Sequence, residues 1–455
     1  MFAGGWALSS ICVVGTGYVG LTVGAGLADL GHEVICLDID AAKIGALQQG
    51  HIPIFEPGLE TLVARNVTAS RLRFSTEYAE AIPHRDFVFI AVDTPTGAAG
   101  EANLDAVDSS TSLAAPHLSA DTIIVTKSTV PIGTGDLVAR IANEHQPDGM
   151  HFPVVSNPEF QREGSAVQDF LKPDRVVIGS PDSAAAKRVA EIYRSFDCEI
   201  IITDLRTAEM IKYASNAYLA TRISFINEIS AICEALGADV QVVARGMGLD
   251  ERVGPKYLDA GIGWGGSCFP KDVRALEHMG SVHGAHPQLL RAVMEINRDA
   301  RRSAVRKLRG AMGDLRNRTI AVLGLSFKPN TDDVRDAPAI EIIHLLLGEG
   351  ATVRAYDPVA TEKARAELGN RVIYATSALQ AAEGADAIVI TTEWNEFREL
   401  DWSAVLEAME GDVLVDGRNM HDPTRMASLG FDYFGMGRAS VGGQKFSSPP
   451  VLTQD

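Results

Sequence analysis

The sequence predicts an α/β fold: two Rossmann-like, doubly wound parallel-sheet domains joined by a long central helix. Short apolar runs rich in β-branched residues alternate with helical patterns over residues 10–127, and the same order returns over 319–416. Such alternation is typical of parallel βαβ units. Between the two stretches, residues 206–236 contain neither Gly nor Pro and repeat apolar side chains at helical spacing, which predicts one long helix.

The predicted strands have matching positions in the two halves. Those of the first half are residues 10–14, 33–38, 86–92 and 122–127, and those of the second are 319–323, 352–357, 386–392 and 412–416. We therefore divide the chain into an N-terminal Rossmann domain (1–205), a central helical domain (206–316), a C-terminal Rossmann-like domain (317–440) and a loosely ordered tail (441–455).

Composition narrows the class of protein. The formal net charge of −18 argues against a nucleic-acid partner, although a few Lys and Arg side chains can still bind a small anion. Five scattered cysteines without a CxxC pair favour reduced thiols in a cytoplasmic enzyme over disulfides or a metal site. The first ten residues do not resemble a signal peptide, and no run approaches the roughly 18 apolar residues of a membrane span.

The turn after the first predicted strand carries the motif GTGYVG at residues 15–20. This G-x-G-x-x-G string follows a strand, opens a helix and precedes Asp38 at about the spacing of a dinucleotide-binding fingerprint. Glycines permit a tight turn, close approach of a pyrophosphate and close helix packing, and the helix N-terminus favours an anion. An acidic Asp38 would bind ribose hydroxyls and repel a 2′-phosphate, which favours NAD over NADP. The alternative is a glycine-rich turn without a ligand.

The corresponding turn of the second half, which begins at Gly324, lacks the second and third glycines. A dinucleotide is therefore not expected there. Lys328 in this turn is suited to hold a shorter phosphorylated ligand.

Residues 263–272, GWGGSCFPKD, surround a candidate nucleophile, Cys268. Three glycines make a permissive loop, Lys271 favours a thiolate, and Asp272 is a candidate base. The alternatives are an inert cysteine at a helix start and an aspartate that only caps the helix.

Two further strings precede the cysteine motif: NPEFQREG at 157–164 and KYASN at 212–216. Together with the glycine loop, they resemble the UDP-glucose/GDP-mannose dehydrogenase family over roughly residues 10–435. Phe269 favours UDP-glucose as the substrate, and the Asn-Pro-Glu-Phe string disfavours N-acetylmannosamine. GDP-mannose or a UDP-hexosamine remains the alternative substrate.

The resemblance implies a four-electron oxidation of a C6 alcohol to a carboxylate, with two NAD⁺ reduced and one water consumed. Cys268 would capture the aldehyde formed first, become a thioester in the second oxidation and be released by water. Two other hypotheses remain open. One is a two-electron dehydrogenase in which Cys268 is structural, and the other is a non-catalytic NAD-binding protein.

The resemblance also implies roles for individual residues. The expected catalytic residues are Cys268, Lys212, Asp272, Asn216, Glu159 and Thr129. The expected NAD contacts are Gly15, Gly17, Tyr18, Val19, Gly20, Asp38, Lys43, Thr94, Thr96, Ser128, Thr129, Glu163, Lys271 and Arg335. The expected substrate contacts are Glu159, Phe160, Glu163, Lys212, Asn216, Arg252, Tyr257, Gly265, Phe327, Lys328 and Arg418.

Lys212 would stabilise an oxyanion, and it shares a helix face with Asn216 because the two are four residues apart. Taken singly, Lys212 could be a solvated helix residue, and Glu159 and Glu163 could be surface charges on a helical turn. Arg252 is expected to reach across a homodimer interface, which the long helix would carry.

Overall fold

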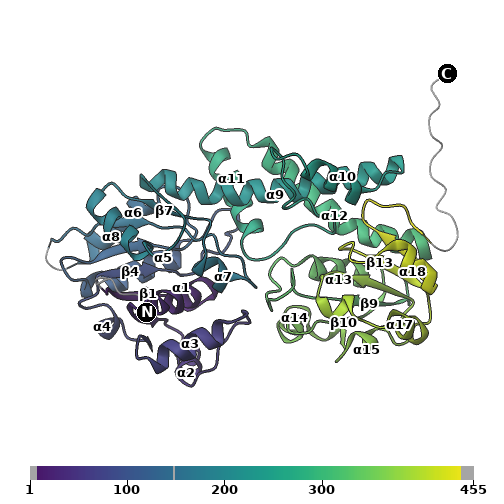
Figure 1. Ribbon diagram of the computed structural model, residues 1–455, viewed down its shortest axis with the longest axis horizontal. Coiled ribbons are helices and arrows are strands. Elements are labelled where there is room, and N and C mark those ends of the chain that lie inside the picture. Colours follow the sequence, from purple (N-terminus) through teal and green to yellow (C-terminus); the bar gives the residue numbers. More distant parts are fainter. Residues whose placement is uncertain (1–7, 147–148, 442–455) are drawn as a thin grey trace. The chain divides into compact units, whose positions relative to one another are not determined.

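The computed structural model describes residues 8–146 and 149–441. These residues form two compact units: residues up to 215 together with 274–283, and residues 216–273 together with those from 284 onward (Figure 1). Residues 1–7 and all of the predicted tail except Val441 lie outside the described ranges.

The first unit is built on an eight-stranded sheet in the order β3-β2-β1-β4-β5-β6-β7-β8. Its strands are β1 Ser10–Val14, β2 Glu33–Leu37, β3 Leu72–Ser75, β4 Phe87–Ile90, β5 Ile123–Thr126, β6 Val154–Ser156, β7 Arg175–Gly179 and β8 Glu199–Thr203. All four strands predicted in this half are confirmed. Every pairing is parallel except that of β6 with β7, where Ser156 lies opposite Gly179, so this sheet departs from the purely parallel prediction at one place.

Helices cover both faces of this sheet. They are α1 Tyr18–Asp29, α2 Ala41–Gln48, α3 Leu59–Thr68, α4 Tyr78–Ala81, α5 Asp105–Ala114, α6 Thr134–His145, α7 Ala166–Leu171 and α8 Ser183–Ile192, with a 3₁₀ turn at Ala115–His117. Alternate residues of β1 enter different cores: Ile11 and Val13 lie in one apolar cluster, Cys12 and Val14 in the other. Burial on both faces explains why the strand is continuously apolar.

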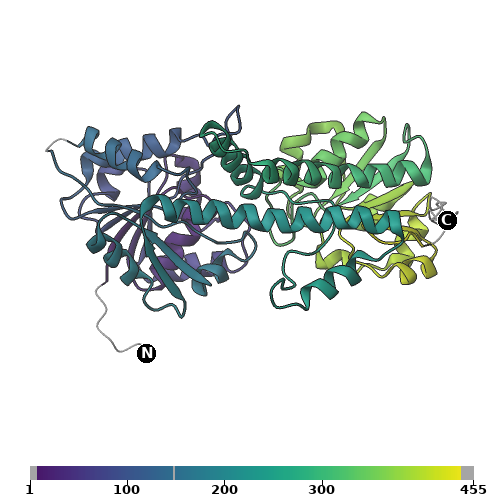
Figure 2. The same cartoon turned by 90° about the horizontal axis from the view of Figure 1, so that it is seen from above.

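Helix α9, Leu205–Leu236, is the long helix that the sequence predicts (Figure 2). Gly237, with φ of +75°, follows it directly, and glycine adopts this left-handed conformation without steric cost. Three more helices precede the second sheet: α10 Val240–Gly248, α11 Phe269–Val282 and α12 Gln288–Met312.

The second sheet has the order β11-β10-β9-β12-β13-β14, and all its pairings are parallel. Its strands are β9 Thr319–Leu323, β10 Thr352–Tyr356, β11 Ile373–Tyr374, β12 Ala387–Ile390, β13 Val413–Asp416 and β14 Asp432–Gly435. The four strands predicted in this half are confirmed. In both sheets the first strand lies between the second strand and a later one, which creates a switch point where open α/β sheets bind ligands.

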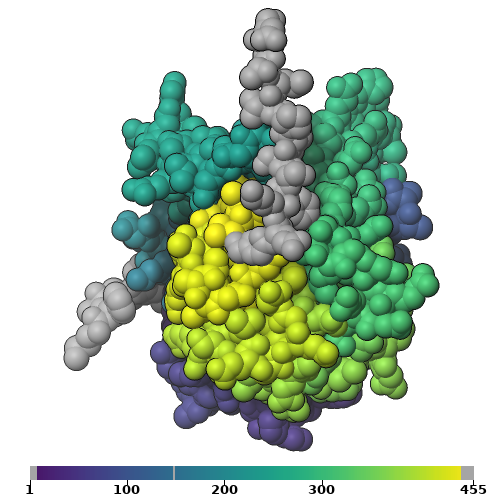
Figure 3. Space-filling model, turned by 90° about the vertical axis from the view of Figure 1, so that its right-hand side faces the viewer, coloured from purple at the N-terminus to yellow at the C-terminus, as the bar shows by residue number. Residues whose placement is uncertain are grey.

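The helices of the second sheet again pack on both of its faces. They are α13 Pro338–Gly348, α14 Thr361–Leu368, α15 Ala378–Ala382, α16 Asn395–Arg398, α17 Trp402–Ala408 and α18 Pro423–Leu429, with a 3₁₀ turn at Gly369–Arg371. In the space-filling view, the last described elements of this unit are yellow and lie beside its light green residues (Figure 3). Within the described ranges, no helix combines the length and apolar character needed to cross a membrane.

Candidate active site

The glycine loop between β1 and α1 has three glycines with three different surroundings. Gly15 has φ of +102°, and a Cβ there would lie 2.4 Å from the carbonyl oxygen of Ala91. A Cβ on Gly20 would lie 2.1 Å from the oxygen of Gly15. A Cβ on Gly17 would meet no heavy atom within 4 Å. The first and third glycines are therefore required by the fold, whereas the second leaves open space at the start of a helix.

Asp38 follows β2 and closes the loop. Its Oδ2 accepts hydrogen bonds from Thr16 N and Oγ1 at 2.9 and 2.7 Å, and from Lys43 Nζ at 3.1 Å. Its Oδ1 accepts one from Asp40 N at 3.1 Å. Burial by itself raises the pKa of Asp38, but these hydrogen bonds outweigh it, and the pKa lies below its ordinary value. The carboxylate therefore stays ionised near neutrality.

This loop fits the adenosine and pyrophosphate of a dinucleotide. The open space at Gly17 and the N-terminus of α1 match the phosphates, and the ionised Asp38 matches the ribose hydroxyls. Tyr18 and Val19 are the first residues of α1 and therefore border the same loop.

The ends of β4 and β5 bring further predicted cofactor residues together. Thr94 Oγ1 donates to the carbonyl oxygen of Thr129 at 2.8 Å, and Ser128 Oγ donates to that of Val92 at 2.6 Å. These bonds hold the two loops side by side. Thr96, by contrast, is exposed.

Lys212 and Glu159 form a buried ion pair in the first unit. Lys212 Nζ donates to Glu159 Oε1 at 2.9 Å, and their side chains are 4% and 3% exposed. Lys212 is thus not a solvated helix residue, and Glu159 is not a surface charge. Removing two charges from water costs free energy unless they are paired, so the two residues depend on each other in this buried position.

Glu159 lies in the loop between β6 and α7, not on the helical turn considered for Glu159 and Glu163. Its Oε2 accepts the backbone N–H of Gln161 at 2.5 Å. Phe160 lies under two cations, with the Arg175 guanidinium 3.8 Å and the Lys212 ammonium 5.4 Å from the ring centre. The loop therefore has one defined conformation around the pair.

The cysteine loop belongs to the second unit, and backbone constraints fix its shape. Gly266 has φ of +86°, and a Cβ there would lie 2.7 Å from the ring of Phe327. Asn297 on α12 accepts from Trp264 N at 2.8 Å and donates to Trp264 O at 2.9 Å. Cys268 is half-buried immediately before α11, and its Sγ lies 3.5 Å from Ser267 Oγ.

Asp272 lies one turn into α11 and is fully buried. Its Oδ1 accepts from Lys271 Nζ at 2.6 Å and its Oδ2 from Asn216 Nδ2 at 2.6 Å. Asp272 therefore does more than cap a helix. It joins the cysteine loop to Asn216 of helix α9.

The predicted nucleotide contacts of the second unit are partly engaged in protein bonds. Arg418 donates to the carbonyl oxygens of Thr391, Gly263 and Phe327, and so ties the cysteine loop to the sheet. The remaining predicted contacts are distributed over the surrounding loops. Lys328 Nζ lies 5.3 Å from the ring centre of Phe327, and Gly265 lies against the carbonyl of Asp336. Arg335 pairs with Asp333 at 2.8 Å, and the exposed Arg252 pairs with Asp250 at 2.6 Å. Tyr257 has a positive φ of +62°.

Three residues that support the site were not among the sequence predictions: Glu56, Arg301 and Asn297, which bonds to the Trp264 backbone. Glu56 accepts the N–H groups of Gly164 and Ala166 at 2.6 and 2.8 Å, and so anchors the loop after Glu159. Arg301 donates to Trp264 O at 2.7 Å beside Asn297. Each support is far from its partner in sequence, and no local pattern marks it.

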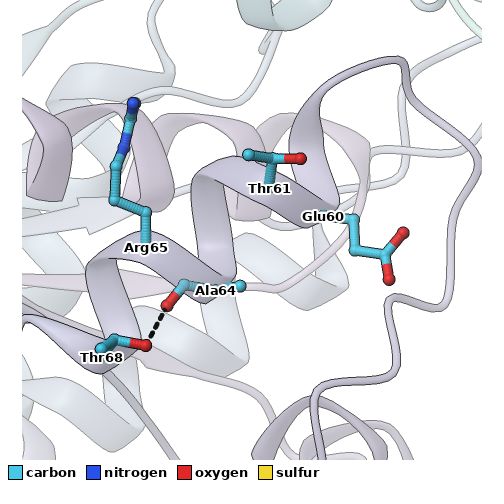
Figure 4. A pocket seen from close by; sticks show the side chains of 5 residues that line it. All are labelled: Glu60, Thr61, Ala64, Arg65 and Thr68. Atoms are coloured by element: carbon cyan, nitrogen blue, oxygen red, sulfur yellow. Dashed lines mark hydrogen bonds between the residues drawn. The ribbon is translucent and has the colours of Figure 1, made fainter.

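One surface hollow of about 550 Å³ is lined by a single face of α3, from Glu60 to Thr68 (Figure 4). It contains no predicted site residue, and Thr68 Oγ1 is bonded back to Ala64 O at 2.8 Å. Across the described parts of the chain, no three His, Cys, Asp or Glu side chains gather as a metal site would require.

The fold and the glycine loop define an NAD-binding dehydrogenase, and comparison with known families makes this specific. Three models of the UDP-glucose/GDP-mannose dehydrogenase family match in order: the NAD binding domain at residues 9–197, the central domain at 206–299 and the UDP binding domain at 321–423. The chain belongs to this family.

Individual relatives agree along nearly the whole chain. It is 46% identical over 432 residues to a UDP-glucose 6-dehydrogenase of Bacillus subtilis, covering 95% of this chain and 98% of that protein. A UDP-glucose 6-dehydrogenase of Rhizobium meliloti is 48% identical, with 94% and 99% covered. A solved UDP-glucose dehydrogenase of Pyrobaculum islandicum has a TM-score of 0.91 and 40% identity, with 96% and 100% covered.

Proposed function

We propose that the protein oxidises UDP-glucose to UDP-glucuronate: UDP-glucose, two NAD⁺ and one water give UDP-glucuronate and two NADH. The observation that carries this proposal is the similarity to UDP-glucose 6-dehydrogenases across 94–96% of the chain. We retain the four-part division at residues 205, 316 and 440 as part of the proposal, with NAD bound to the first part and the uridine nucleotide to the third.

The chain's own chemistry centres on Cys268. When bound, NAD⁺ accepts a hydride from the substrate carbon in each of the two oxidations. The sulfur adds to the aldehyde carbon to give a thiohemiacetal, which the second oxidation converts to a thioester. Water then breaks the carbon–sulfur bond and regenerates the thiol. Covalent capture keeps the reactive aldehyde on the protein between the two oxidations.

The buried polar groups have matching roles in the proposal. Lys212 stabilises the oxyanion that forms at the substrate carbon, and Glu159 takes a proton from the attacking water. Asp272, oriented by Asn216, exchanges protons with the substrate oxygen, together with Thr129. The double hydrogen bonding of Asp272 supports this role, because a base must be held in one orientation.

The proposal extends to a homodimer formed through helix α9. Tyr218, Phe225 and Ile232 are 62%, 41% and 48% exposed and recur every seven residues, so they form one apolar stripe. A second copy of the stripe is its natural partner, and Arg252 is the residue we expect to reach across. All five cysteines lie in the described ranges and form no disulfide there, which supports a cytoplasmic location.

A substrate panel with NADH stoichiometry tests the proposal. UDP-glucose, GDP-mannose, UDP-N-acetylglucosamine and UDP-N-acetylmannosamine are each supplied with excess NAD⁺, and NADH is counted per molecule of sugar nucleotide consumed. We expect turnover with UDP-glucose and two NADH per molecule. Turnover with another sugar nucleotide alone would replace the substrate, and one NADH per molecule would exclude the thioester route.

A further inference from the structure

A second lysine, Lys127, is buried in the first unit, and its hydrogen-bond partner Asn157 lies two residues before Glu159. Lys127 directly follows β5 and is 5% exposed. Its Nζ donates to Asn157 Oδ1 at 3.1 Å and lies 5.6 Å from the ring centre of Tyr193. Lys127 thus has a neutral amide as its hydrogen-bond acceptor, whereas Lys212 has the carboxylate.

The amide of Asn157 is fixed in the orientation that Lys127 uses. Asn157 Nδ2 donates to the carbonyl oxygen of Val177 at 2.8 Å, so its Oδ1 must face the other way. That oxygen also accepts from Tyr193 Oη at 2.6 Å. Both lone pairs of Oδ1 are therefore used, and the amide presents Lys127 with no negative charge.

The charges that face Lys127 come from two elements. Glu159 belongs to the loop after β6 and Lys212 to α9, while Tyr193 at the end of α8 contributes a neutral ring. Burial lowers the pKa of Lys127 to about 7; Glu159 opposes this shift and Lys212 adds to it. The cluster of two lysines and one carboxylate therefore changes from neutral to singly positive as Lys127 gains a proton.

We propose that Lys127 is a positioning residue that controls proton transfer at Glu159 through its own charge. A neutral Lys127 leaves the carboxylate paired only with Lys212 and able to take a proton from water. A protonated Lys127 places a second cation beside Glu159 and makes it a poorer proton acceptor. This inference rests on the proposed function, in which Glu159 assists hydrolysis.

The step concerned is hydrolysis of the Cys268 thioester. The water oxygen bonds to the acyl carbon, the carbon–sulfur bond breaks, and Glu159 takes a proton from the water. The products are a carboxylate, the free thiol and one released proton. No electrons are transferred in this step, and the NADH burst, which precedes it, reports on the two oxidations separately.

Two variants distinguish the effect of the charge of Lys127 from the effect of its hydrogen bond. Lys127→Gln and Lys127→Arg both retain an N–H donor for Asn157, but the first is neutral and the second is always cationic. Lys187→Gln, on the exposed face of α8, is the matched control. For each protein, kcat and KM are measured over a range of UDP-glucose concentrations, and the NADH burst at saturating UDP-glucose and NAD⁺, from pH 5.5 to 9.

We expect the wild type and the Lys187 control to lose kcat below pH 7. The Gln variant should shift this loss by about one pH unit or more to lower pH, because the titrating group is gone. The Arg variant should have a kcat about 10-fold lower at every pH, with KM within about 3-fold and with the NADH burst retained.

Coinciding pH profiles for the Gln and Arg variants would overturn the proposal, because a merely structural lysine would tolerate both or neither. If neither variant folds, a ¹³C NMR titration of the lysine ε-carbons in the wild type decides. A resonance with its midpoint near pH 7 supports the proposal, and midpoints all above about 9 refute it. Absence of NADH formation by the wild type at every pH would instead remove the proposed function itself.

Discussion

Each of the two sheets has an aspartate directly after its second strand, and the two carboxylates differ in what they bind. Asp357 Oδ2 accepts from Leu325 N, Ser326 N and Oγ, and Trp394 Nε1, at 2.7 to 3.1 Å. Its Oδ1 accepts the N–H groups of Val359 and Ala360. Asp357 is 2% exposed and fully engaged. Asp38, by contrast, has a single backbone donor on Oδ1 and a more accessible side chain.

The turns after β1 and β9, which donate hydrogen bonds to Asp38 and Asp357, also differ. In the first unit, α1 begins at Tyr18, immediately after Gly17. In the second, α13 begins at Pro338, far along the chain from Gly324. A helix N-terminus adjoins only the first turn. An acidic residue at a strand end therefore does not by itself predict dinucleotide binding; the glycine spacing and the helix start decide it.

Alanine at the two aspartates should affect different properties. Asp357→Ala leaves at least five buried donors without their acceptor and should lower the free energy of unfolding by about 3–5 kcal/mol. Asp38→Ala should lower it by only about 1–2 kcal/mol but weaken NAD⁺ binding about 10-fold or more. Urea unfolding and NAD⁺ titration measure the two effects. Equal losses of stability would remove the distinction between a structural and a ligand-binding aspartate.

Valine at the second glycine of the loop, Gly17, should affect NAD⁺ binding without affecting the fold. Gly17→Val places its side chain in open space, so the fold should persist while NAD⁺ affinity falls about 100-fold, or about 2.7 kcal/mol. Binding of UDP, measured by calorimetry on the same protein, should be unchanged. Gly348→Val on α13, which also faces open space, is the control. An NAD⁺ affinity within about 3-fold of the wild type would place the pyrophosphate elsewhere.

The smallest effect expected is that of pH on NAD⁺ affinity. The pKa of Asp38 is below its ordinary value, so the charged form is stabilised in the folded protein. Binding involves only the folded protein, so the contribution of Asp38 to NAD⁺ affinity is complete until the pH falls through this lowered, folded pKa. Affinity should therefore vary less than about 2-fold between pH 5 and 8. A 10-fold fall between pH 6 and 5 would assign the contact to another group.

The sequence predicts the fold through strands whose residues are buried on both faces. Runs such as residues 10–14 and 319–323 are apolar without interruption because each face meets its own core. Two of the strands that escaped prediction are short or half-exposed, whereas β7 escaped although four of its five residues are buried. β6 has three residues, and β8 is only partly buried, so neither has a distinctive pattern. The antiparallel pairing of β6 with β7 depends on tertiary packing, which no local pattern encodes.

The sequence also predicts part of the candidate site. The glycine loop, Asp38, Lys212 and Cys268 belong to strings with recognisable spacing. Glu56 and Lys127 do not, because their roles depend on burial against residues far away in the sequence. A lysine after a strand is ordinarily solvated, and only the packed structure places it beside an amide and out of water.

We propose that Cys268 carries the substrate between two oxidations, and intact-protein mass spectrometry of a Cys268→Ser variant tests this covalent step. With UDP-glucose and excess NAD⁺, the variant should accumulate a covalent ester, heavier by UDP-glucuronate less one water, because an oxyester hydrolyses far more slowly than a thioester. An unmodified variant that forms UDP-glucuronate at the wild-type rate would contradict the account.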